Sequence, residues 1–185
     1  MAWQDVKHGL VNASHMLQLA KESYCRVKSY AKNRDAKFEV AFFAPGAPDA
    51  LYPPPADAPW RDAWAVTEAT LRAMRDDAAA QSAAFWIVTL SNAIQVHPKL
   101  AVRRRFREAL GADTLFYPDD RIRAFAEREG IPAVVLAPRL RAYAVANGAF
   151  LHGFGNTSYG YGHWNRTGHA VAGALIADAI CPPAR

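Results

Sequence analysis

Two continuous apolar runs constrain the fold of this chain more than any other feature. They are AAFWIVTL, residues 83–90, and IPAVVLAP, residues 131–138. Neither run alternates apolar with polar residues, which is typical of strands covered on both faces, as in parallel sheets. The helical segment between them supplies a crossover of suitable length. We therefore predict two neighbouring parallel strands, at 84–90 and 132–137.

The residues around these runs predict helices. Gly130 is expected at the end of one helix, and Asn147 with Gly148 at the end of another. The alternation of strand and helix in this half of the chain indicates an α/β fold with a parallel sheet. The predicted helices cover residues 10–32, 60–81, 101–110, 118–130 and 139–148, and a last helix from about Asn165.

The first 59 residues have a different character. KFEVAFFAP, residues 37–45, predicts a short strand, and the Pro-rich residues 45–59 predict a stiff connector running over the surface. We divide the chain into an N-terminal part, 1–59, with a helix, a strand and this connector, and a main domain, 60–185. No apolar run approaches the ~18 residues of a membrane span, and the first residues lack the order of a signal peptide, which leaves the compartment undetermined.

The formal net charge of +5 owes much to one segment, AVRRRFREAL, residues 101–110. Val102 and Phe106 fall on one side of the predicted helix, which leaves its arginines on the other sides. No aromatic platform accompanies these arginines, so we expect a solvated face and no nucleic-acid partner. The arginines are Arg103, Arg104, Arg105 and Arg107.

The two cysteines, Cys25 and Cys181, lie near opposite ends of the chain without CxxC spacing. A single disulfide and two buried thiols are both compatible with this arrangement. No group of His, Cys, Asp or Glu has the spacing of a ligand set, so we predict neither a metal nor a cofactor.

Polar residues follow the first strand and precede the last helix. Ligands of open parallel sheets bind beyond the carboxyl ends of the strands. Asn92, Gln95 and His97, in the segment SNAIQVHP, are therefore candidates for binding substrate. The alternative reading is a polar loop between strand and helix, with no role in binding. The second segment contains His152, Asn156, His163 and Asn165.

His163 is the strongest candidate for chemistry. It stands between glycines at the entrance of the last predicted helix, in GYGHWNRTGHAVAG, residues 160–173. An imidazole there can accept and return a proton near neutral pH, as a general base does. The alternative is a histidine that only caps or packs. We expect His169 to lie inside the helix in a structural role.

GHWNRTGHAVAG resembles the last sequence block of SGNH (GDSL-type) hydrolases, in which a catalytic histidine precedes a turn into the final helix. The resemblance extends over residues 60–181. DAWAVTEATLRAM, FWIVTLSNAIQVHP and LFYPDDRIRAFAEREGIPAVVLAP follow the order seen in the C-terminal half of bacterial SGNH hydrolase-like proteins.

This resemblance implies a three-layer α/β/α, flavodoxin-like fold whose N-terminal strands are missing from this chain. It implies that His163 is the catalytic base, which activates a serine to attack a small-molecule ester or an acylated glycan. Trp164, beside it, would contact the substrate. Asn165 and Gly168 would shape the turn.

Two features depart from the family pattern. The positions where the family places an aspartate before the histidine hold Gly160 and Tyr161, and the chain contains no G-D-S block and no oxyanion block. Ser14 and Ser91 lack the surroundings of a nucleophile. We therefore expect a fragment carrying the catalytic-histidine block, inactive as a hydrolase on its own.

Two other functions fit the same residues. One is an O-acyltransferase of the same fold that acts on a polysaccharide. The other is a non-catalytic relative that binds sugars through Trp164, Tyr159 and Tyr161. The oligomeric state is not determined by the sequence.

Overall fold

The computed structural model describes residues 49–155 and 158–181, together with five separate positions near the N-terminus. Those five positions are helical, within the helix predicted at 10–32: Met16, Leu19, Ser23, Tyr24 and Val27. The remainder of that predicted helix, the strand predicted at 37–45, and Cys25 lie outside the described residues.

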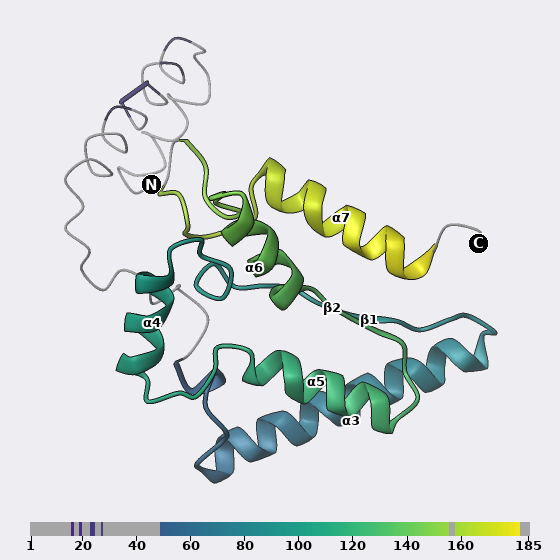
Figure 1. Cartoon of the computed structure of the whole chain (residues 1–185). Coiled ribbons are helices and arrows are strands. Elements are labelled where there is room, and N and C mark those ends of the chain that lie inside the picture. Colours follow the sequence, from purple (N-terminus) through teal and green to yellow (C-terminus); the bar gives the residue numbers. More distant parts are fainter. Residues whose placement is uncertain are drawn as a thin grey trace, which may run out of the picture.

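A short parallel sheet lies at the centre of the described part, between helices (Figure 1). Helices α4 and α5 lie between its two strands in the sequence. The elements in chain order are η1 (Asp49–Leu51), α3 (Ala58–Ala80), β1 (Ile87–Thr89), α4 (Leu100–Ala109), α5 (Tyr117–Arg128), β2 (Ala133–Val135), α6 (Leu136–Ala146) and α7 (Arg166–Ile180).

The predicted parallel pairing is confirmed. Ile87 pairs with Ala133 and Thr89 with Val135, so both strands run in the same direction. Both strands are shorter than predicted, because β2 leads directly into α6 at Leu136. Pro138, the expected end of the strand, instead lies in the first turn of α6, where a backbone N–H has no helical partner to lose.

Helices cover both faces of the sheet. Ile87 packs in one cluster with Phe125 of α5, whereas Val88 and Val134 pack in another with Leu140 of α6. Figure 1 shows α3 and α5 on one side of the strands and α6 and α7 on the other. Burial on both faces explains the apolar runs without alternation. The described part is therefore a mixed α/β structure.

Helix α4 packs on the segment that follows β1. Val102 and Phe106 are buried, as the pattern predicted. Tyr52 packs edge-on against Phe106, with ring centroids 5.7 Å apart, and is only 2% exposed. The prediction that the Pro-rich segment runs over the surface is therefore wrong at Tyr52, because this ring fills the space between α4 and the loop after β1.

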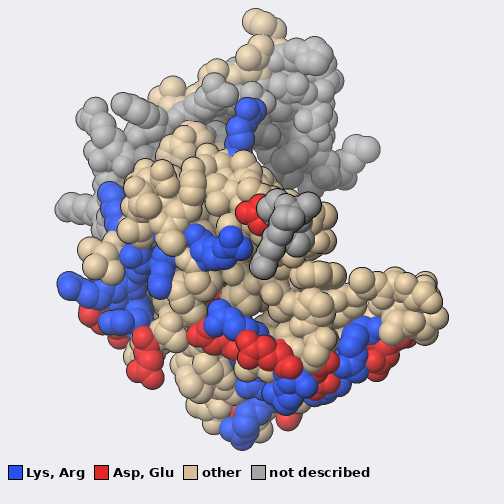
Figure 2. Space-filling model, turned by 45° about the vertical axis from the view of Figure 1, so that its right-hand side comes forward, with Lys and Arg blue, Asp and Glu red and all other residues tan. Residues whose placement is uncertain are grey.

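Helices α3 and α5 are joined by ion pairs at their surface. Glu68 of α3 binds Arg121 at 2.9 Å and Arg128 at 3.2 Å. Glu129, at the end of α5, binds Arg72 at 3.0 Å and Arg75 at 3.2 Å. Along this edge Figure 2 shows basic and acidic side chains intermixed.

None of the described helices has the length and apolar character needed to cross a membrane. Cys181, just after α7, is an exposed free thiol.

Candidate functional site

The buried polar side chains of the described residues gather at one place, beyond the carboxyl end of β1. They come from the loop that follows β1, from α5 and from the loop that precedes α7. Burying a polar group is unfavourable unless it is hydrogen-bonded, so this concentration marks a region built for fixed geometry. The five side chains are Ser91, Gln95, His97, Asp119 and His152.

Ser91 and His152 form a pair across these two loops. Ser91 Oγ lies 3.2 Å from His152 Nε2, and His152 Nδ1 lies 2.7 Å from the carbonyl oxygen of Gly162. A carbonyl oxygen can only accept, so Nδ1 carries the proton and donates to Gly162. Nε2 of the neutral ring is then an acceptor, and the Ser91 hydroxyl donates to it.

Trp164 completes this group. Its indole Nε1 donates to Ser91 Oγ at 2.9 Å, so the Ser91 oxygen both accepts and donates. Residues His152 and Trp164 also form an isolated antiparallel bridge. We call Ser91, His152 and Trp164 the serine–histidine clamp, because together they hold the loop before α7 against the end of β1.

His163 lies within the clamped loop with its side chain exposed. Its carbonyl oxygen accepts a hydrogen bond of 3.0 Å from the backbone N–H of Gly153. The residues on either side, Gly162 and Trp164, both bond to members of the clamp. The backbone of His163 is therefore fixed on both sides while its imidazole faces outward.

The start of α7 explains the sequence around His163. Asn165 caps the helix by accepting from the backbone N–H of Gly168 at 3.0 Å, and its Nδ2 donates to the carbonyl of Phe150 at 2.8 Å. A Cβ on Gly168 would stand 2.2 Å from the carbonyl oxygen of Leu151, so only glycine fits there. His169 lies inside α7 as predicted, and its ring packs edge-on against Trp164.

Gln95 is the centre of the loop after β1. Its Nε2 donates to the carbonyl of Leu115 at 2.8 Å and to Asp119 Oδ2 at 2.6 Å. Its Oε1 accepts from the backbone N–H of Asn92 at 2.7 Å, while Asn92 Nδ2 donates to Tyr52 Oη at 3.1 Å. Gln95 is 1% exposed, so these contacts hold the loop internally. Its predicted role toward substrate stays a prediction, as does that of Asn92.

Asp119 is a buried carboxyl group that sequence reasoning missed. It is 3% exposed and accepts from Thr89 Oγ1 at 2.9 Å as well as from Gln95. Burial raises the pKa of Asp119, while these two hydrogen bonds act in the opposite direction. The residue ties α5 to the end of β1 and to the loop that follows it.

His97 joins the two loops from the other side. Its ring packs edge-on against Phe150, with centroids 5.2 Å apart, and its Nδ1 accepts from the backbone N–H of Lys99. Gly160 has a φ of +81°, and a Cβ there would stand 2.8 Å from His97 Cδ2. Glycine is therefore required where the loop before α7 crosses this ring. The predicted role of His97 in binding substrate stays a prediction.

Burial controls the charge of both buried imidazoles. It lowers the pKa of His97 to about 4, and it lowers that of His152, to which the neighbouring His163 contributes. Both rings are therefore neutral near pH 7. A neutral His152 agrees with the hydrogen-bond pattern of the clamp.

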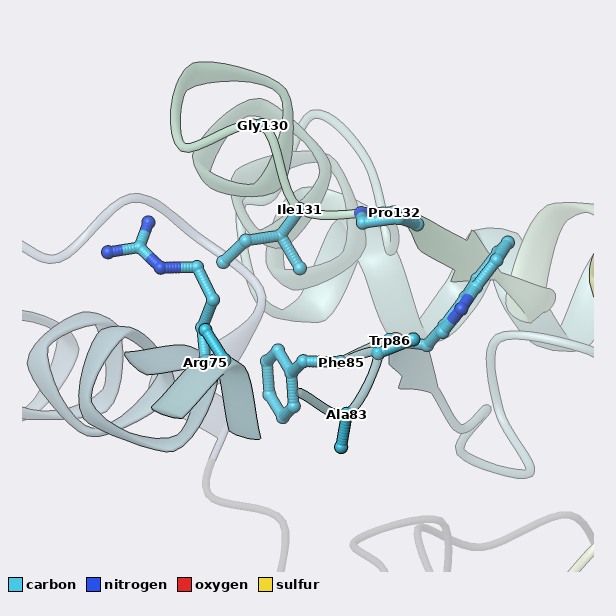
Figure 3. Close-up of a pocket in the computed structure, with 9 residues that line it drawn as sticks. Arg75, Ala83, Phe85, Trp86, Gly130, Ile131 and Pro132 are labelled. Atoms are coloured by element: carbon cyan, nitrogen blue, oxygen red, sulfur yellow. The ribbon is translucent and has the colours of Figure 1, made fainter. Parts of the chain in front are cut away.

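The opposite end of the sheet has a different surface. A pocket of about 240 Å³ is lined there by the residues that lead into the strands, among them Trp86, Ile131 and Pro132 (Figure 3). Arg75 reaches its edge, but that guanidinium is already paired with Glu129. Ligands of parallel sheets bind at the carboxyl ends, so this pocket is not the candidate site.

The structure thus brings together the two segments that the sequence singled out. Of the predicted site residues, Gln95 and His97 are buried, Asn92 and Trp164 are half-buried, and His163 is exposed. The Ser91–His152 pair was missed, because its members stand 61 positions apart and no spacing links them. In the described part of the chain, no three His, Cys, Asp or Glu side chains group as metal ligands.

Comparisons with protein-family models, with curated proteins and with solved structures found no match to this chain.

Proposed function

We propose that this chain is the C-terminal part of an SGNH/GDSL-type ester hydrolase with a flavodoxin-like fold, in which His163 is the catalytic base. The sequence block around His163 supports this family. The described helices on both faces of a parallel sheet agree with the proposed fold, and the loop that carries His163 meets the carboxyl end of β1.

The observation that carries the proposal is the contrast between the backbone and the side chain of His163. The backbone is held by Gly153, and its neighbours Gly162 and Trp164 are held by the serine–histidine clamp. The imidazole itself is exposed. Catalytic groups need a rigid frame and an accessible reactive atom, and this arrangement provides both.

In the proposed reaction, the His163 imidazole takes the proton of a serine hydroxyl as that oxygen attacks the ester carbonyl. It then gives the proton to the leaving alcohol, and water releases the acyl group in a second round. Ser91 is assigned to the frame, because the residue is only 7% exposed and its hydroxyl is bonded to His152 and Trp164. The proposed nucleophile is a serine of a G-D-S block, which residues 1–185 do not contain.

The test uses p-nitrophenyl acetate with two forms of the protein. Residues 1–185 alone should turn over no faster than their own His163→Ala variant. A longer protein, extended through any in-frame G-D-S block upstream of Met1, should be active and should lose about 1000-fold or more with His163→Ala. Arg166→Ala is the control, since it removes an exposed side chain at the start of α7, three positions from His163, and should leave turnover unchanged. Near-normal activity of the extended His163→Ala protein would remove His163 from the mechanism.

A second candidate is an esterase that uses Ser91 and His152 as nucleophile and base. The 3.2 Å contact and the orientation of His152 by the Gly162 carbonyl favour it, because this is the geometry of an activated serine. It requires the buried Ser91 to become accessible. Residues 1–185 alone would then be active, Ser91→Ala would abolish turnover and His163→Ala would spare it.

The acceptor of the acyl group is a separate question. An O-acyltransferase acting on a polysaccharide would use the same serine and histidine, so the products must be analysed with an acyl donor in the presence and absence of a glycan. Transfer to the glycan would favour the acyltransferase. Glycan binding without any turnover would favour a non-catalytic relative that stacks sugars on Tyr159, which is 55% exposed.

A further inference from the structure

A hollow lined by four arginines lies beside α4. Its volume is about 420 Å³, and we call it the arginine pocket. Asp113 is the acidic residue among those that line it. Figure 2 shows basic side chains gathered on the side where Figure 1 places α4. The four arginines are Arg103, Arg104 and Arg107 of α4 and Arg141 of α6.

Two of these arginines are half-buried without a carboxylate partner. Among the described residues, Arg72 and Arg75 of α3 and the arginines of α5 bind carboxylates, and Arg104 pairs with Glu108. Arg103 and Arg141 form no such ion pair with a described residue. Arg103 instead donates to the carbonyl oxygen of His97. The guanidinium of Arg141 lies 3.9 Å above the ring of Phe116. These contacts orient both guanidiniums but leave their charges uncompensated.

The arrangement of these two guanidiniums is electrostatically unfavourable. Burial lowers the pKa of Arg103 and of Arg141, and the positive charge of Arg103 lowers the pKa of Arg141 further. Two like charges held close together and partly away from water repel each other. An anion between them would relieve this repulsion. The sequence predicted a solvated face for these arginines; Arg104, Arg105 and Arg107 are exposed, whereas Arg103 is half-buried.

We propose that the arginine pocket binds the phosphate group of a small phosphate monoester. A guanidinium presents a planar pair of donors that matches phosphate oxygens. Several arginines together match the double negative charge of a phosphate monoester better than they match the single charge of a carboxylate ligand. The volume lies within the range of small-molecule sites. Phe116, which contacts Arg141, is buried beneath that guanidinium, so it offers no platform on which nucleic-acid bases could stack.

The arginine pocket also touches the candidate site. Arg103 bonds to the carbonyl of His97, and the His97 ring contacts Gly160 in the loop that carries His163. A phosphate group bound to Arg103 would therefore contact a residue that helps to hold this loop in place through His97. Binding itself does not depend on the ester-hydrolase proposal, because its test measures no turnover.

The test is calorimetric titration of residues 1–185 with a hexose 6-phosphate, with inorganic phosphate and with the free hexose. We expect saturable binding of one hexose 6-phosphate, tighter than inorganic phosphate, and no binding of the free hexose. Arg141→Gln and Arg103→Gln should each weaken binding about 10-fold or more, as expected for loss of a charge-assisted contact. Arg139→Gln is the control. It removes an exposed charge from α6, the helix that carries Arg141, and should change the affinity less than about twofold.

Melting of the variants separates binding from folding. Without ligand, Arg141→Gln removes a repelled charge but also the contact of the guanidinium with Phe116, so we expect its melting temperature to stay close to that of the wild type. Arg141→Lys keeps the charge but loses the planar pair of donors. The hexose 6-phosphate should raise the melting temperature of the wild type and of Arg139→Gln, but not of Arg141→Gln. Equal binding by Arg141→Gln, or no saturable binding, would overturn the proposal. Equal affinity for inorganic phosphate would overturn the monoester assignment, and tighter binding of duplex DNA would replace it with a nucleic-acid surface.

Discussion

The carboxyl end of the sheet and the contact between α3 and α5 are both built from polar side chains, but in different ways. At the carboxyl end, Ser91, Gln95 and Asp119 are buried. Ser91 is hydrogen-bonded to His152 and Gln95 to Asp119, in both cases away from solvent. Between α3 and α5, Glu68 binds two arginines and Glu129 binds three, at the edge of the protein. The polar contacts of the first region are hydrogen bonds away from water. Those of the second are ion pairs between largely buried glutamates and arginines that are partly exposed to water.

The difference indicates which region the chain keeps rigid. A buried hydrogen bond has a defined partner, and its loss leaves an unsatisfied group in the interior. An exposed ion pair is screened by salt and can be replaced by water. The loops that carry His97 and His163 are therefore held by hydrogen bonds with defined partners. The polar contacts of α3 are of the weaker kind, and its buried contacts with α5 are the apolar ones of Trp64 and Leu71.

The largest expected effect is at Asp119. Asp119→Leu leaves Thr89 Oγ1 and Gln95 Nε2 without this acceptor, and we expect it to lower the free energy of unfolding by about 2–4 kcal/mol. Urea denaturation measures this change. A loss no larger than that of an exposed ion pair would remove the contrast between the two regions.

Asp119→Asn is the matched control for this substitution. Its side-chain oxygen can accept from Gln95, and its amide can donate to Thr89 Oγ1, because a hydroxyl also accepts. We expect a loss of less than about 1 kcal/mol, since the hydrogen bonds remain and a buried charge is removed. An equal loss in both variants would show that the charge, rather than the hydrogen bonding, holds this end together.

Acid should weaken the carboxyl end before it weakens the α3–α5 contact. Unfolded His97 binds a proton near pH 6.5, whereas folded His97 does so only near pH 4. Between these values the unfolded chain binds more protons, so stability falls as the pH falls. The lowered pKa of His152 acts in the same direction, and the raised pKa of Asp119 acts in the opposite one; we expect a net loss of stability across this range.

His97→Asn tests the source of this pH dependence. The asparagine oxygen can take the place of Nδ1 as acceptor for the Lys99 N–H, but it does not titrate. The loss of stability between pH 6.5 and pH 4, measured by urea denaturation, should become smaller in this variant. An unchanged pH profile would assign the acid sensitivity to other groups.

The parallel strands and most helix ends could be predicted from local patterns. Apolar runs marked β1 and β2, and Asn165 marked the start of α7, because strand burial and helix capping depend on neighbouring residues. The Ser91–His152 pair, the buried Asp119 and the packed Tyr52 could not be predicted in this way. Each depends on which distant segments the folded chain brings together, and no local signal records it.

The smallest expected effect is at Glu68. Glu68→Gln removes the ion pairs with Arg121 and Arg128, and we expect it to lower the free energy of unfolding by less than about 1 kcal/mol. About 0.5 M NaCl should abolish most of the difference from the wild type. Glu127→Gln, an exposed position of α5, is the control, and urea denaturation at low and high salt measures both variants. A loss of stability that does not depend on salt would show that the ion pairs of Glu68 behave like the buried hydrogen bonds at the carboxyl end of the sheet.

The pairing of β1 with β2 also has a consequence for the order of folding. The strands meet only after the chain between Thr89 and Ala133, which contains α4 and α5, has been looped back. Helices form within about a microsecond, whereas pairing across such a separation must first overcome the entropy of closing the loop. We expect α4 and α5 to acquire helical signal early in refolding, and the amides of β1 to become protected from hydrogen exchange late. The carboxyl end, and with it the frame around His163, would then be among the last parts of the molecule to form.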